Sequence, residues 1–79
     1  MTHGFSHSQI WLALDALATQ HGLTPSGLAR TAGLDPTAFN KSKRVTSNGR
    51  PRWPSTESLA KVLAATGSSL DEFVQLVSR

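Results

Sequence analysis

The chain contains no cysteine and only five acidic residues. Without cysteine it can form no disulfide, no thiolate metal site and no cysteine nucleophile. It also lacks a long apolar run, and its first residues, MTHGFSHS, have neither the basic start nor the apolar middle of a signal peptide. These absences argue against a membrane or secreted protein, so we expect a cytoplasmic location.

The length of 79 residues suits one domain with one small core, and 38% of the residues are hydrophobic. We therefore predict a single folded domain over residues 1–79, with a loose N-terminal arm over residues 1–7. His3 and His7 are four residues apart, a spacing that can bind a metal from one helix turn. Because no third ligand lies near them, we expect no metal and no cofactor.

The basic residues are concentrated in one segment, although the net charge is only +3. Five of the eight lie between positions 41 and 52, and no acidic residue lies among them: Lys41, Lys43, Arg44, Arg50 and Arg52. A focused positive potential of this kind favours a polyanionic partner. The alternative is a solvated basic loop that has no partner.

Three helices are predicted from apolar periodicity outside the centre of the chain. The first covers about residues 9–21 after a cap near Ser6 or Ser8, and its core face consists of Ile10, Leu14, Leu17 and Ala18. Another follows a cap at Ser55 or Thr56 and ends at Gly67. The last begins with a capping box in which Ser69 and Glu72 satisfy each other's free amides.

Two further helices are predicted in the centre, where a start signal occurs twice. Thr24 precedes Pro25 and Asp35 precedes Pro36, so each pair supplies a side-chain cap and a proline at the first helical position. Gly33 between them can adopt the left-handed conformation that ends a helix. Two capped helices joined by a glycine turn form a helix-turn-helix, which gives an all-α fold of five helices.

The third predicted helix, residues 36–44, would direct Phe39 inward and a polar face outward. At 100° per residue that face covers an arc of about 100° and contains Thr37, Asn40, Lys41 and Arg44. In a DNA major groove a lysine can donate to guanine, an asparagine can pair with adenine, and a threonine methyl can contact thymine. The alternative is an ordinary polar helix surface.

Residues 45–54 are predicted to form a loop, because residues 47–49 are turn-forming and two prolines exclude a helix. Arg50 and Arg52 would follow the phosphate backbone of a nucleic acid or reach its minor groove. Trp53 is expected to anchor the loop by packing against the core, with stacking on a nucleic acid as the alternative.

Two stretches, GLTPSGLARTAGLDPTAFNKSKR and WPSTESLAKVLAATGSSLDEF, together resemble the lambda repressor-like, or Xre-type, helix-turn-helix family over about residues 8–77. The resemblance implies a five-helix domain that binds operator DNA as a dimer. It implies base contacts from Thr37, Asn40 and Lys41. It implies phosphate contacts from Ser26, Lys43, Arg44, Arg50 and Arg52. The chain is also similar to the N-terminal domain of repressors that carry a self-cleaving, peptidase-like C-terminal domain, which this chain does not include.

The expected function is therefore sequence-specific binding of double-stranded DNA by a transcriptional regulator, a repressor, with the third helix in the major groove. The alternative is a helical protein-interaction module, such as an adapter or antitoxin-like partner domain, for which Leu12 and Leu76 offer apolar contacts. We expect no enzyme, because the sequence has no paired carboxylates, phosphate loop, nucleophile with a base, or metal-ligand set.

Overall fold

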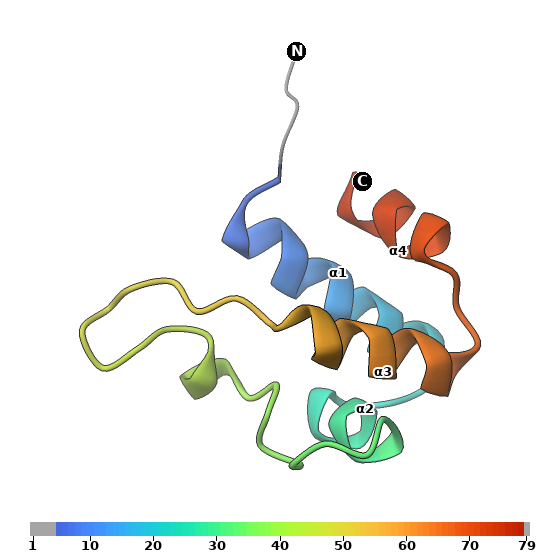
Figure 1. Cartoon of the computed structure of the whole chain (residues 1–79), viewed down its shortest axis with the longest axis horizontal. Coiled ribbons are helices and arrows are strands. Elements are labelled where there is room, and N and C mark those ends of the chain that lie inside the picture. The colour runs from blue at the N-terminus through green and yellow to red at the C-terminus, as the bar shows by residue number, and fades with distance from the viewer. Residues whose placement is uncertain (1–4, 79) are drawn as a thin grey trace.

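The computed structural model describes residues 5–78, and this part of the chain is all-helical, as predicted. It contains four α-helices and one short 3-10 helix: α1 (His7–Gln20), α2 (Pro25–Thr31), η1 (Lys41–Lys43), α3 (Thr56–Thr66) and α4 (Leu70–Val77). Helix α1 packs against both α2 and α4, and α2 packs against α3 (Figure 1). None of the helices in this part of the chain is long and apolar enough to cross a membrane.

Helix α1 begins at His7, directly after Ser6, which is one of the two caps that the sequence predicted. The Ser6 hydroxyl accepts the Gln9 backbone N–H at 3.1 Å, and the Gln9 side chain accepts the Ser6 backbone N–H at 2.6 Å. This reciprocal cap confirms the predicted cap near Ser6, and it places His7 in the helix rather than in the N-terminal arm that was predicted to extend to residue 7. Residues 1–4 lie outside the described part, and they include His3, which was weighed with His7 as a metal ligand.

The predicted starts of α2, α3 and α4 are confirmed. Thr24 caps α2 by accepting the Gly27 backbone N–H at 3.0 Å, with Pro25 as the first helical residue. Ser55 caps α3, and Ser69 and Glu72 form the capping box that opens α4. Short polar side chains therefore define these boundaries locally, independently of tertiary packing.

The prediction of a third helix over residues 36–44 is wrong, and with it the five-helix count. Residues 36–39 form turns, Asn40 is extended (φ −63°, ψ 148°), and only Lys41–Lys43 form a 3-10 turn. In an α-helix the Phe39 carbonyl would accept the Lys43 N–H. Here the Lys43 N–H donates to the Asn40 carbonyl at 2.8 Å, and the Arg44 guanidinium donates to the Phe39 carbonyl at 3.0 Å.

One hydrophobic core joins all four helices to this irregular segment. Its buried residues are Ile10, Trp11, Ala13, Leu14, Leu17, Ala18, Leu28, Ala29, Phe39, Val62, Phe73 and Val77. Phe39 is only 3% exposed, and its ring meets that of Trp11 edge to face at a centroid distance of 6.0 Å. The inward direction predicted for Phe39 is thus confirmed without the helix that was expected to produce it.

Residues 44–52 form a basic hairpin that projects beyond the helices, as the yellow-green segment of Figure 1 shows. Val45 and Pro51 form an isolated antiparallel bridge, and the Arg52 N–H donates to the Arg44 carbonyl at 2.9 Å. The tip turns at Gly49, whose φ of +79° favours glycine. The predicted loop therefore has a defined, paired base.

Candidate nucleic-acid interface

Four of the five clustered basic side chains are exposed and have no acidic partner in the part of the chain that the structure describes. The two ion pairs among residues 5–78 are Arg44 with Asp15 and Lys61 with Glu57. The exposed, unpaired cations are Lys41, Lys43, Arg50 and Arg52. They come from η1 and the basic hairpin, which follow each other directly in the chain, so their charges are available to an external polyanion.

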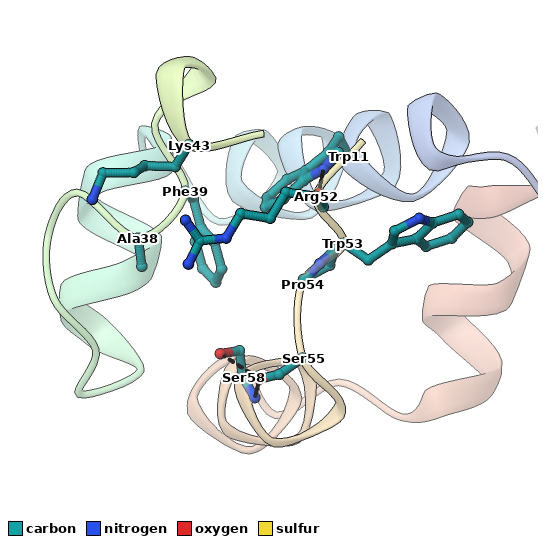
Figure 2. Close-up of a pocket in the computed structure, with 9 residues that line it drawn as sticks. All are labelled: Trp11, Ala38, Phe39, Lys43, Arg52, Trp53, Pro54, Ser55 and Ser58. Carbon is teal, nitrogen blue, oxygen red and sulfur yellow. Dashed lines mark hydrogen bonds between the residues drawn. The ribbon is translucent and has the colours of Figure 1, made fainter. Parts of the chain in front are cut away.

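Lys43 and Arg52, from opposite ends of this region, line one cavity of about 190 Å³. Its other walls are aromatic or carry hydroxyl groups: Trp11, Phe39, Trp53, Ser55 and Ser58, with Ala38 and Pro54. Figure 2 shows Arg52 and Trp53, neighbours in sequence, pointing in opposite directions from the backbone. The cavity therefore combines positive charge with aromatic surface, a combination that suits the phosphates and bases of a nucleic acid.

Arg44 is not available to phosphate, contrary to its predicted role. Its guanidinium forms a bidentate pair with the Asp15 carboxylate at 2.7 and 3.0 Å, and its side chain is only 11% exposed. It also lies over the Trp11 ring, with Cζ 4.6 Å from the ring centroid. Because all of these contacts face the protein, Arg44 is a structural residue that links the hairpin to α1.

The three predicted base-reading residues do not share one helical face. The Thr37 hydroxyl donates to the Asp35 carboxylate at 2.6 Å. Thr37 is exposed, so its methyl group remains free to contact a partner. Asn40 precedes η1 and makes no side-chain capping bond there. Lys41 is exposed and lines a shallow hollow beside Leu12 of α1. Of the three residues, only Asn40 and Lys41 therefore have polar groups that can bind a partner.

Ser26 lies on a different element from these residues. It is half-buried in the first turn of α2, two residues after the Thr24 cap. Nothing in the structure joins its side chain to the basic hairpin, so the predicted phosphate contact from Ser26 would have to be made separately.

Trp53, which was predicted to anchor the loop by packing against the core, is 49% exposed. Its ring meets that of His7 edge to face at 5.9 Å and also borders an apolar groove of about 250 Å³. The exposed apolar side chains of this groove are Phe5, Trp53, Leu70 and Val74. Trp53, Pro54 and Ser55 line both this groove and the basic cavity, so the two hollows adjoin each other.

Sequence reasoning missed the contribution of His7, Trp11 and Asp15, which hold the basic hairpin in place. His7 Nε2 lies 2.7 Å from the Arg44 carbonyl oxygen, and Trp11 Nε1–H donates to the Arg52 carbonyl at 3.0 Å. The sequence did contain a pattern that could have indicated this role. The three residues are spaced by four, which places them along one side of a helix.

Asp35 accepts two hydrogen bonds from Thr37, one from the hydroxyl and one from the backbone N–H at 2.8 Å. These bonds, the hydroxyl's first and the N–H second, hold the pKa of Asp35 below its ordinary value, and they outweigh slight desolvation while Lys43 adds to the lowering. Because the folded pKa is lowered, the stabilisation is present at neutral pH and is lost as the pH falls through that pKa.

Replacing the Thr37 hydroxyl by a methyl group should therefore raise the pKa of Asp35 toward its ordinary value. Thr37→Val retains the backbone N–H and the branched shape, and carboxyl carbon NMR across a pH titration measures the change. Thr19→Val, at an exposed threonine of α1, is the matched control and should leave this pKa unchanged. A titration midpoint that Thr37→Val does not move would contradict the assigned cause.

Metal-ligating residues do not gather in the described part of the chain: no group of three or more His, Asp or Glu could hold an ion there. Comparisons of the chain with protein-family models, with curated proteins and with solved structures found no significant match.

Proposed function

We propose that this chain binds double-stranded DNA sequence-specifically as part of an Xre-type transcriptional regulator, a repressor acting in the cytoplasm. The observation that carries the proposal is the group of four exposed, unpaired cations Lys41, Lys43, Arg50 and Arg52. Cationic side chains that can replace condensed counterions supply most of the nonspecific attraction to DNA. An enzymatic role has no comparable support.

Within this proposal, the segment from Thr37 to Lys41 reads bases and the basic hairpin contacts phosphates. Asn40 and Lys41 carry polar groups that suit adenine and guanine edges in the major groove. The segment would enter the groove as an irregular turn and 3-10 helix, with α2 beside it in a helix-turn-helix-like arrangement. Phosphate contacts fix position and base contacts add sequence preference, so the two sets of residues should respond differently to mutation.

The proposal is tested by selecting binding sites from random duplex DNA at defined salt and then comparing two variants. Lys41→Ala should reduce discrimination at one base position by about 1 to 3 kcal/mol, because it removes a base-edge contact. Arg50→Ala should weaken binding to all sequences alike, because it removes a phosphate contact. Binding constants on selected and random duplexes measure both effects.

Two outcomes would count against these assignments. An equal loss on selected and random duplexes for Lys41→Ala would remove that residue from base reading. Failure of the unaltered protein to bind any duplex at low salt, where charge attraction is strongest, would reject DNA binding as a whole.

A second candidate function, protein interaction, is favoured by the apolar groove. Four exposed apolar side chains on one groove are characteristic of a surface that contacts another protein. In a DNA-binding regulator the occupant would be a second copy of this chain, which would pair two binding surfaces on a two-fold DNA site. In an adapter or antitoxin-like domain it would be a different protein, whose complex should be insensitive to salt and independent of DNA.

A further inference from the structure

Helix α1 presents a line of polar groups to the base of the basic hairpin. His7, Trp11 and Asp15 are spaced by four residues, so they lie one above another on the helix surface. Their partners are the two residues that begin and end the hairpin, Arg44 and Arg52. The hairpin is thus attached to α1 at both of its ends.

The surroundings of His7 determine which hydrogen bond its ring makes. Nε2 lies 2.7 Å from the Arg44 carbonyl oxygen and 3.0 Å from the Arg52 carbonyl oxygen. A lone pair at Nε2 would face two carbonyl oxygens and be repelled, so Nε2 carries the proton and donates to Arg44. Trp11 Nε1 is also 3.0 Å from Nε2, but it cannot donate to a protonated nitrogen and instead donates to the Arg52 carbonyl.

The side chain of Arg44 adds a second attachment at the same end. It donates to the Asp15 carboxylate through both terminal nitrogens and to the Phe39 carbonyl through Nη2 at 3.0 Å. Its position over Trp11 removes most of it from solvent. Because a planar guanidinium held at three acceptor atoms has one geometry, the direction in which the hairpin leaves the helices is fixed.

We propose that His7 and Asp15 are positioning residues for nucleic-acid binding, which hold the basic hairpin ready for contact although neither touches the partner. The proposal rests on the proposed function. A hairpin that is ordered before binding avoids the entropic cost of being ordered by the partner. The phosphate contacts of Arg50 and Arg52 therefore depend on hydrogen bonds between α1 and the base of the hairpin.

The test compares His7→Ala with His7→Gln in the full chain. The Gln amide N–H can replace the Nε2–H donor, whereas Ala cannot. We expect His7→Ala to speed hydrogen exchange at the Arg52 amide, which closes the hairpin base, and to weaken DNA binding about tenfold. His7→Gln should restore both values toward those of the unaltered protein.

Two controls separate positioning from general destabilisation. Gln20→Ala changes an exposed side chain of α1 that lies beside Glu72 and Gln75 of α4, and it should alter neither measurement. Exchange at amides within α3 reports the stability of the fold and should stay unchanged in His7→Ala. Asp15→Asn, which neutralises the Arg44 pair, should also loosen the hairpin, whereas Glu57→Gln in the exposed pair with Lys61 should not.

The outcomes distinguish this inference from the proposed function. Unchanged exchange at Arg52 in His7→Ala would show that the contact does not hold the hairpin. Faster exchange with unchanged DNA affinity would show that holding the hairpin does not serve binding; either result overturns the inference while DNA binding stands. If the unaltered protein binds no duplex, the proposed function fails, and the positioning role in nucleic-acid binding fails with it.

Discussion

Trp11→Ala should lower the free energy of unfolding by about 3 to 5 kcal/mol, the usual cost of removing a buried tryptophan side chain. Trp11 is 4% exposed, meets the Phe39 ring and supports the Arg44 guanidinium. Its removal also leaves the Arg52 carbonyl without the indole donor. For a domain of this size the total stability is about 4 to 12 kcal/mol, so much of it would be lost.

The measurement is urea unfolding and thermal melting followed by far-ultraviolet circular dichroism. A loss of about 4 kcal/mol corresponds to a melting temperature lower by about 15 to 30 °C in a small domain. The other tryptophan supplies a matched control, because Trp53 is half exposed and Trp53→Ala should cost about 1 kcal/mol or less. Equal destabilisation by the two substitutions would contradict the burial assigned to Trp11.

Replacing Lys43, Arg50 and Arg52 together by glutamine should weaken DNA binding about a hundredfold at 0.15 M salt. The reason is that each phosphate contact contributes about 0.9 to the slope of log affinity against log salt. At this salt concentration the loss of one contact therefore lowers the affinity about fivefold. Three lost contacts should also make the slope shallower by about 2 to 3. Titration of a labelled duplex at several salt concentrations measures both quantities.

The control for this variant removes positive charge elsewhere on the surface. Arg30 of α2 and Lys61 of α3 are exposed and lie outside the basic segment, so replacing both by glutamine tests net charge alone. Charges farther away than about 8 Å are largely screened at this salt, so we expect less than about a twofold loss per charge. Comparable losses in the two variants would show that attraction is diffuse and that the basic segment is not a binding surface.

The starts and stops of the described helices were predictable because they depend on neighbouring residues. Thr24 and Ser69 each accept a backbone N–H within their own first turn. Gly33 and Gly67 each adopt a positive φ at the end of a helical segment. Residues with a Cβ atom rarely adopt this conformation. The core stripe of α1 was likewise predictable, since its apolar residues recur at the helical period.

The absence of the third helix could not be predicted from neighbouring residues, because Asp35 caps the backbone there as a helix start requires. Asp35 accepts the Thr37 N–H, as a capping residue does, but the chain leaves the helical path at Asn40. What competes with the helix is the Arg44 guanidinium, which occupies the Phe39 carbonyl while pairing with Asp15. Asp15 precedes Arg44 by 29 positions, so no local pattern contains this interaction.

By itself, therefore, the sequence determined an all-helical domain, the boundaries of most of its helices, the core face of α1 and the concentration of positive charge between residues 41 and 52. The tertiary structure alone decided which of those charges are free. Capping and periodicity act over one helix turn, whereas the attachment of the basic hairpin joins residues far apart in the chain. Arg44 turned inward because Asp15 and Trp11 stabilise it there, and Arg50 and Arg52 remained available to a partner.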